Sequence, residues 1–516
     1  MKKKFIVEFL LLFFLGGITS LSLPPFNFFL LNFFTFSIFF GFLFKKLNSH
    51  IGKKVFFFYG WFFGFGYFLT NLYWISISLT FDEDFNFLIP FAIILIPSFL
   101  ALFYGLISFV FNLFNPKNIL SAFFGFSVLF GIIEFLRGII LTGFPWNLIV
   151  YSFSKNLSFI NILSLIGTNS LNLIVISIFT APTIYILRKS NKEIGVCIFL
   201  LLLPITFFFY GDFQKQEFKN KKLKEIPYTI RIVGSNISLN RFYDSTQTED
   251  VINELISISS PIPNKKMFFL WPEGIIPNTY QNEINLYSDI FIKNFDENHL
   301  IGLGITNREL RNNEYKFYNS FSVFDNKLNL IENYNKTNLV PFGEFLPLEN
   351  ILEKIGLKTI TNNFGSFTKG NKRSVIKLKN KDSSEKLKFL PLICYEIIYS
   401  GNLTNNYNFD FIFNISEDGW FGKSIGPKQH FAHSIFRAIE SGKYVLRSAN
   451  NGMSAVINPL GEIEKQINFG SSGYIDLEKR RNSNVTVFST YGNMIFIILI
   501  LLYIFLTISF NRIRNE

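Results

Sequence analysis

Long apolar stretches dominate the first 213 residues and constrain the fold of this chain more than any other feature. A helix needs about 20 predominantly apolar residues to cross the hydrocarbon core of a bilayer. Eight stretches come close to this length or exceed it: 5–22, 26–44, 55–79, 87–113, 118–137, 158–187, 194–211 and 492–510. The sequence therefore predicts eight membrane-spanning helices. Residues 1–213 would form a membrane domain of seven helices, and residues 491–516 would contain the eighth helix and a short cytoplasmic tail.

The basic residues of the loops alternate between the two sides of the predicted membrane domain. One side receives nearly all of them: Lys2, Lys3, Lys4, Lys45, Lys46, Lys53, Lys54, Lys117, Arg188, Lys189, Lys192, Arg512 and Arg514. The other side receives the acidic loop 82–84 and the loop 138–157, which contains one Lys. Because cytoplasmic loops are enriched in Lys and Arg, both termini are predicted to be cytoplasmic. Residues 214–490 would then lie outside the cytoplasm, which is the periplasm in a bacterium with two membranes, and the chain would be a multi-pass protein of the inner membrane.

Charge and cysteine content argue against several classes of partner. The formal net charge is +12, but no basic stripe with interleaved aromatic residues indicates nucleic-acid binding. We attribute the charge to a general bias toward Lys and to basic residues that flank the membrane spans. Only two cysteines are present, Cys197 in a predicted helix and Cys394 in the polar part of the chain, and we expect both to be free thiols. The four His residues show no ligand spacing, so no metal is expected.

Residues 214–490 read as a soluble α/β domain. Eight segments have the composition of strands: 228–233, 267–270, 300–306, 321–324, 389–393, 411–414, 444–447 and 455–458. Residues 429–441 fit an amphipathic helix, in which Arg437 and Glu440 are expected to form a structural ion pair. The Asn- and Lys-rich stretches 214–226 and 370–387 are expected to be linker or surface loop. Strands mixed with helices over this length favour a layered α/β fold.

Three chemically useful side chains of this domain each lie just after or beside an apolar segment. Glu273 follows 267–270, Cys394 follows 389–393, and Lys336 lies between them in sequence. A thiol attacks a carbonyl only as the thiolate, so it needs a base and a group that stabilises the oxyanion. Glu273 can serve as the base and Lys336 as the oxyanion partner. A lone Cys after a strand is usually only a buried thiol. The sequence motifs around these residues must therefore show whether the three side chains form a catalytic site.

The sequence motifs around the three residues are specific enough to indicate a protein family. The motifs 271–273 (Trp-Pro-Glu), 334–344 (Tyr-Asn-Lys-Thr-Asn-Leu-Val-Pro-Phe-Gly-Glu) and 393–396 (Ile-Cys-Tyr-Glu) resemble the nitrilase superfamily, whose Glu, Lys and Cys triad sits on a four-layer α-β-β-α sandwich. With the predicted membrane helices, nearly the whole chain resembles the apolipoprotein N-acyltransferase family of that superfamily. Further segments support this resemblance: 134–138, 143–146, 414–422, 426–430 and 447–452.

The resemblance implies a two-step acyl transfer without a cofactor. Cys394 would take an acyl chain from a phospholipid, and the α-amine of a diacylglyceryl-cysteine at the N-terminus of an apolipoprotein would then attack the thioester. Glu273 would act as the base and Lys336 would hold the oxyanion. Glu344 would orient the lysine, and Tyr395 and Glu396 would shape the site. The expected partners are the phospholipid, the apolipoprotein and the membrane, and the enzyme is expected to be a monomer.

Two segments depart from the family pattern. Glu417 stands where the family more often has Asn, and the residues alone offer no account of the change. The first strand ends in 234–237 (Gly-Ser-Asn-Ile), where the family usually has a Gln-Gly-Asn-like start with an aromatic residue soon after, a place that Phe242 could take. These departures bear on contacts with the acyl chain and leave the triad intact.

Other readings of the sequence remain open. A membrane-tethered amidase would keep the triad and let water resolve the thioester, although a water-soluble amide needs no membrane domain. A transporter or receptor with an external ligand-binding domain would leave the Cys394 segment unexplained and predicts broken helices at mid-membrane. Within the membrane domain, Glu134 and Arg137 are read as a mutually satisfied pair. Trp146 is either an interfacial anchor or part of a lipid-facing lid.

Overall fold

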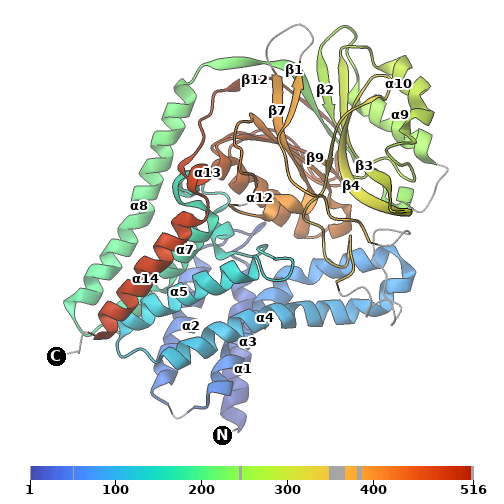
Figure 1. Ribbon diagram of the computed structural model, residues 1–516. Coiled ribbons are helices and arrows are strands. Elements are labelled where there is room, and N and C mark those ends of the chain that lie inside the picture. The colour runs from blue at the N-terminus through green and yellow to red at the C-terminus, as the bar shows by residue number, and fades with distance from the viewer. Residues whose placement is uncertain are drawn as a thin grey trace. The chain divides into compact units, whose positions relative to one another are not determined.

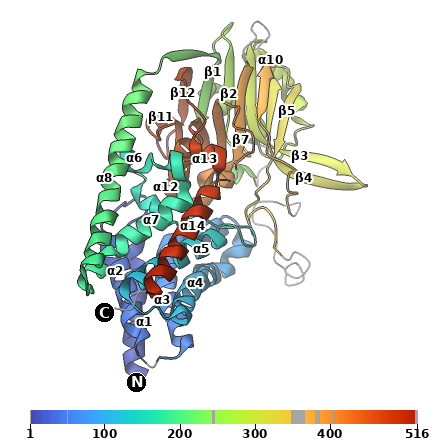
Figure 2. The ribbon, with the colours of Figure 1, turned by 60° about the vertical axis from the view of Figure 1, so that its left-hand side comes forward.

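The computed structural model describes residues 2–49, 51–242, 247–347, 366–379, 386–401 and 403–512 (Figures 1 and 2). The chain divides into two compact units. The helical unit consists of Met1–Gln216, Ser424–Ala432 and Thr486–Glu516, and the sheet unit consists of Glu217–Lys423 and His433–Val485.

The helical unit contains eight long helices among the described residues: α1 (Lys2–Ser20), α2 (Leu31–Leu47), α3 (Lys53–Leu72), α4 (Ile89–Phe114), α5 (Ile119–Arg137), α7 (Leu163–Ile186), α8 (Asn191–Asn220) and α14 (Met494–Arg512). Six spans, the ones that contain α3, α4, α5, α7, α8 and α14, are long and apolar enough to cross a membrane. Large apolar side chains of α4, α8 and α14 are exposed, as expected for helices that face lipid. The membrane architecture is therefore confirmed for six of the eight predicted spans. The other two coincide with α1 and α2, and α2 has only 17 residues.

Two details of the helical unit correct the sequence-based expectations. The predicted span 158–187 is interrupted, because α7 bends at Gly167 (φ 74°), where a side chain would collide with the ring of Phe488. Helix α8 continues to Asn220 and the first strand begins at Leu223, so the stretch 214–226 is not a linker. An apolar membrane helix can carry a polar final turn beyond the hydrocarbon region, and the composition alone does not mark that end.

The polar residues singled out in this unit are buried. Glu134 and Arg137 form the expected ion pair, and Arg137 also donates to the backbone oxygen of Phe144. The ring of Trp146 is buried, so its reading as an exposed interfacial anchor is wrong, whereas its place in a lid stays a prediction. Its indole N–H donates to Oε1 of Gln429 (2.9 Å), which also accepts from the indole of Trp74 (3.2 Å). A buried indole needs such a hydrogen-bond partner.

The sheet unit contains two six-stranded sheets whose inner faces share one core. The first has the order β12 (Gly473–Arg481), β1 (Leu223–Gly234), β2 (Met267–Leu270), β3 (His299–Arg311), β4 (Glu314–Asp325), β5 (Leu330–Asn335). The second has the order β11 (Ile463–Ile467), β10 (Ser454–Ile457), β9 (Tyr444–Asn450), β8 (Phe411–Glu417), β7 (Lys386–Ile393), β6 (Ile376–Lys379). Phe268 of the first sheet packs against Phe389 and Phe413 of the second.

Helices cover the sheets on their outer sides. Helices α9 (Thr248–Ser259) and α10 (Ser288–Asn294) lie on the first sheet (Figure 1), where they bury a second apolar cluster around Phe269 and Trp271. The predicted amphipathic helix is α12 (Gly426–Ser441), whose residues Ile435 and Ile439 pack at Gly461, beyond the end of β10. Arg437 and Glu440 form the expected buried ion pair. The expected layered α/β fold is confirmed.

All eight predicted strands are present, and four strands were missed: β5, β6, β11 and β12. These four are the outermost strands of the two sheets. An edge strand has one neighbour and keeps much of its surface in solvent, so it tolerates charged side chains that hide the strand pattern. The strand β11 (Ile-Glu-Lys-Gln-Ile) is an example. The stretch 370–387, expected to be a loop, contains β6 and the start of β7, whereas its residues 380–385 lie outside the described part of the chain.

Candidate active site

The three predicted triad residues each follow a strand at the same end of the sandwich. Glu273 follows β2, Lys336 follows β5 and Cys394 follows β7 directly. The turn at Glu273 lies against β3 so closely that a Cβ on Gly304 would come within 2.5 Å of the Cα of Glu273. Only glycine permits this approach. The next residue in the turn, Gly274, has a positive φ of 51°, a conformation that glycine adopts without strain.

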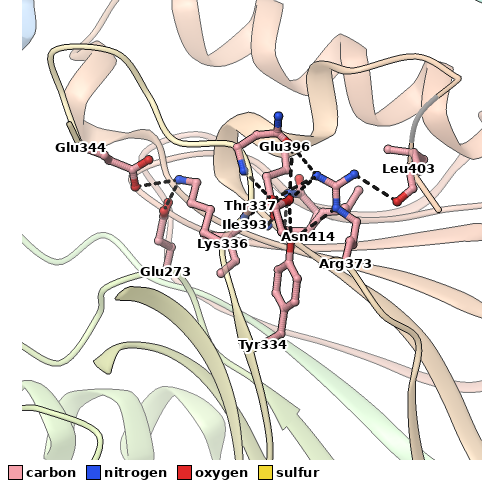
Figure 3. Close-up of polar contacts among 12 residues, drawn as sticks. Glu273, Tyr334, Lys336, Thr337, Glu344, Arg373, Ile393, Glu396, Leu403 and Asn414 are labelled. Carbon is pink, nitrogen blue, oxygen red and sulfur yellow. Dashed lines mark hydrogen bonds and ion pairs between the residues drawn. The ribbon is translucent and has the colours of Figure 1, made fainter. Parts of the chain in front are cut away.

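Lys336 lies between two glutamates (Figure 3). Its Nζ is 3.1 Å from Oε1 of Glu273 and 2.8 Å from Oε1 of Glu344. The side-chain amide of Asn319 on β4 donates to the same two oxygens, at 2.7 and 2.6 Å. All four side chains are buried. The structure therefore brings Glu344 to the ammonium, the place from which it can orient the lysine.

The pKa values of Lys336 and Glu344 depend on each other and on the charge of Glu273. Burial by itself lowers the pKa of Lys336, but the carboxylates of Glu273 and Glu344 outweigh that effect and raise the pKa well above its ordinary value. The ammonium thus stays charged at neutral pH. Burial raises the pKa of Glu344, with Lys336 opposing and Glu273 adding to the rise. A permanent cation in a buried site is the group that a developing oxyanion requires.

Cys394 begins the short 3₁₀ helix Cys394–Ile398 and is buried. Its φ is +47°, a left-handed conformation that a residue with a side chain adopts at a cost of about 1–3 kcal/mol, and such strain gathers at functional sites. Burial and the Glu273 carboxylate raise the pKa of the thiol well above its ordinary value, while Lys336 and a hydrogen bond with Ser416 oppose the rise. At rest the group is a neutral thiol, so its attack on a carbonyl requires a base.

Glu396 joins the Lys336 and Cys394 segments. Its Oε1 accepts from the backbone N–H groups of Thr337 (2.8 Å) and Asn338 (3.1 Å), and its Oε2 accepts from the backbone N–H of Ile393 (2.9 Å). The hydroxyl of Tyr334 (2.7 Å) and the guanidinium of Arg373 (3.1 Å) complete the cluster. One buried carboxylate therefore ties the chain just after the lysine to the chain just before the thiol.

The Glu396 cluster also links stability to pH. Burial by itself raises the pKa of Glu396, but Arg373 and the hydrogen bonds outweigh it, and the pKa lies below its ordinary value. A carboxyl group whose pKa is lowered by folding stabilises the fold above the pH at which an unfolded Glu titrates, about 4.3. That contribution is lost as the pH falls through the lower pKa of the folded state.

Sequence reasoning missed several residues of the site. Asn319 lies inside a strand with no motif around it, and Arg373 lies in the stretch that was expected to be a loop. The one available signal was the polar pair Asn319-Ser320 directly before the predicted strand 321–324. The ring of Tyr395 packs edge-on against the ring of Tyr399. The described residues contain no group of three or more His, Cys, Asp or Glu side chains that could hold a metal ion.

Replacing Glu273 with Gln should have opposite effects on two reactions of Cys394. Because the Glu273 carboxylate raises the pKa of the thiol, the variant should react severalfold faster with iodoacetamide at pH 8, and the midpoint of its pH profile should fall. Acylation by an ester should slow by about 10²–10⁴-fold, because the base is lost. Mass spectrometry of the Cys394 peptide measures both reactions. Glu344→Gln is the matched control, since Glu344 also binds Lys336 but is not among the main causes of the raised thiol pKa. An unchanged alkylation profile in Glu273→Gln would contradict this placement of the carboxylate.

Comparison with known proteins finds two matching families. The apolipoprotein N-acyltransferase N-terminal domain family matches residues 15–181, and the carbon-nitrogen hydrolase family matches residues 295–482. The apolipoprotein N-acyltransferase of Agrobacterium fabrum is 32% identical, over 97% of this chain and 96% of that protein. The protein of the same name from Rickettsia prowazekii is 32% identical, over 94% of this chain and 96% of its own length. A solved amidase of the nitrilase superfamily from Nesterenkonia covers 49% of this chain at 13% identity with a TM-score of 0.35, and nothing further about this chain follows from that similarity.

Proposed function

Because this chain belongs to the apolipoprotein N-acyltransferase family, we propose that it transfers an acyl chain from a phospholipid to the N-terminal α-amine of the diacylglyceryl-cysteine of an apolipoprotein. This reaction is the last step of bacterial lipoprotein maturation. The observation that carries the proposal is the buried Lys336, bound by Glu273 and Glu344 and acting electrostatically on the Cys394 thiol. The described part of the chain also contains six spans able to cross a membrane, which suits two substrates that both reside in a bilayer.

The first step would form a thioester. Glu273 accepts the proton of the Cys394 thiol, and the sulfur attacks the ester carbonyl carbon of the phospholipid. The negative charge that develops on the carbonyl oxygen is stabilised by the Lys336 ammonium. The C–O bond of the ester then breaks, and the lyso-phospholipid leaves with the proton that Glu273 returns to it. Glu273 is a carboxylate again at the end of this step.

The second step would transfer the acyl chain to nitrogen. The neutral α-amine of the apolipoprotein attacks the thioester carbonyl, and Lys336 again stabilises the oxyanion. Glu273 accepts a proton from the attacking amine, the C–S bond breaks, and the proton passes to the leaving thiolate. The products are an amide and the free Cys394 thiol. The raised pKa of Cys394 favours this return to the neutral thiol, and no step requires a cofactor.

A thioester intermediate predicts ping-pong kinetics. Phospholipid with a radiolabelled acyl chain, given alone, should label Cys394 with a hydroxylamine-sensitive bond and release one equivalent of lyso-phospholipid. A diacylglyceryl-peptide added afterwards should take the label as a hydroxylamine-resistant amide. Lyso-phospholipid that appears only with both substrates present would instead indicate direct transfer in a ternary complex. Loss of the label to water at the same rate without peptide would favour a membrane-tethered amidase.

We further propose that the helical unit is the membrane domain, that residues 214–490 form the catalytic domain in the periplasm, and that both termini are cytoplasmic. The loop charges motivate this topology. A reporter fused at Asp382 should be active only outside the cytoplasm, and one fused after Glu516 only inside. Cytoplasmic activity of the first fusion would refute the topology. Because one chain supplies Glu273, Lys336 and Cys394, we propose a monomer, which light scattering of the purified protein can test.

A further inference from the structure

A buried ion pair next to the triad is not used by the mechanism above. Nη2 of Arg241 is 2.6 Å from Oε2 of Glu417, and both side chains are almost completely buried. The same Oε2 accepts from the side chain of Asn450 (2.7 Å), and Oε1 accepts from the backbone N–H of Gly419 (2.8 Å). A buried ion pair has a large desolvation cost and is weak evidence for stability alone, so its position deserves a physical explanation.

Each partner of the pair also binds the turn that carries Glu273. The backbone N–H of Glu417 donates to Oε2 of Glu273 at 3.0 Å. Nη2 of Arg241 donates to the backbone oxygen of Gly274 at 3.2 Å. Because Lys336 and Asn319 bind the other oxygen, Oε1, of Glu273, the carboxylate is restrained on both sides. Glu417 therefore restrains Oε2 of the Glu273 carboxylate, and Arg241 restrains the backbone of the same turn.

Glu417 provides the counter-charge for the buried guanidinium of Arg241. An Asn there is shorter and neutral, and it would leave the Arg241 guanidinium buried without a counter-charge. Glu417 supplies that charge and reaches Arg241. Burial raises the pKa of Glu417, and Arg241, Asn450 and the Gly419 N–H counteract the rise. The two residues lie 176 positions apart in the chain and meet only in the folded domain.

We infer that Arg241 and Glu417 are a pair of positioning residues that orient the Glu273 carboxylate toward the Cys394 thiol. The inference rests on the proposed function in taking Glu273 as the base. A base displaced by about 1 Å can lose on the order of 10² in rate. Neither partner needs to contact substrate for this role, so the pair should affect the rate constant of acylation and leave the affinity for phospholipid unchanged.

A double-mutant cycle tests the pair. Arg241→Met and Glu417→Gln each leave one buried charge unpaired, whereas Arg241→Met/Glu417→Gln removes both. We expect each single variant to lower the rate constant of Cys394 acylation by about 10–100-fold, with KM for phospholipid and the burst amplitude per folded molecule unchanged. Because the two residues act as one unit, the double variant should be about as slow as the slower single variant, and not slower by the product of the two losses. Because it contains neither charge, the double variant keeps the test valid even if a single variant does not fold.

Arg231→Met is the matched control. Arg231 is also buried in the sheet unit and paired with an acid, Asp476 (2.7 Å), but neither contacts the Glu273 turn. It should lower the thermal stability without changing the acylation rate constant. Variants of the pair that lose only stability or burst amplitude would show a purely structural role. A double variant whose loss of rate is the product of the two single losses would show that the residues act independently and would overturn the inference.

Alkylation of Cys394 by iodoacetamide separates this inference from the proposed function, because it needs no lipid. In both single variants the pH midpoint of alkylation should fall, as for Glu273→Gln, since a displaced carboxylate no longer raises the thiol pKa. An unchanged midpoint in both would overturn the inference, even if the wild-type protein forms the thioester. Failure of the wild-type protein to form a thioester from phospholipid would refute the proposed function and leave the alkylation result to decide on the pair.

Discussion

Cys394→Ser is expected to abolish formation of the acyl-enzyme, with a loss on the order of 10⁴-fold or more in transfer rate. The resting group at this position is a neutral thiol, because burial and Glu273 raise its pKa, and Glu273 must remove its proton. A serine hydroxyl is far less acidic than a thiol, so the same carboxylate cannot activate it. The hydroxyl fits the space of the thiol, and the fold should therefore survive.

Labelled phospholipid and mass spectrometry of the Cys394 peptide measure this loss directly. Cys197→Ser is the control, since Cys197 lies in α8 of the helical unit and its replacement should leave transfer unchanged. Normal transfer by Cys394→Ser would refute a thioester on this residue. Loss of transfer in Cys197→Ser as well would point to a general effect of cysteine replacement on folding.

Lys336→Met should lower the rate of Cys394 acylation by about 10²–10³-fold, because the oxyanion loses its cation. The substitution also leaves Glu273 and Glu344 without their shared partner, and an uncompensated buried charge costs about 3–5 kcal/mol of stability. The rate must therefore be measured per folded molecule, by titration of the burst.

The double variant Lys336→Met/Glu344→Gln separates catalysis from folding. It removes one buried carboxyl charge together with the cation, so it should recover part of the lost stability while acylation stays slow. If Lys336→Met acylated Cys394 at nearly the wild-type rate per folded molecule, Lys336 would have a structural role only. Recovery of the acylation rate in the double variant would likewise contradict the oxyanion role.

The central strands could be predicted from the sequence, and the edge strands could not. Strand β8 is buried along its whole length and begins with the apolar run Phe411–Phe413, which is the pattern of a covered strand. Strand β11 has three polar residues between two terminal isoleucines and is mostly exposed. Nothing in its composition distinguishes it from a loop, because its strand conformation depends on the neighbour β10 that pairs with it.

The helical unit also combines features that the sequence predicted with features that it did not predict. Apolar composition predicted the spans of α3, α4, α5, α7, α8 and α14, since a bilayer imposes length and hydrophobicity on each helix separately. It did not predict the bend at Gly167 or the burial of Trp146, which depend on contacts with Phe488 and Gln429 far along the chain.

By itself the sequence determined the chemical inventory of the site: a carboxylate, an ammonium and a thiol, each within a specific motif, with the carboxylate and the thiol placed after predicted strands. Their catalytic roles stay predictions until the variants are measured. Only the tertiary structure decided how these groups are held, because Lys336 lies 63 residues from Glu273 and the two meet through the fold alone. It also supplied partners that no local pattern marks, Asn319 and Arg373, and it paired Arg241 with Glu417. These contacts are necessary because a buried charge without a partner has a large desolvation cost, and only the tertiary structure brings such a partner close.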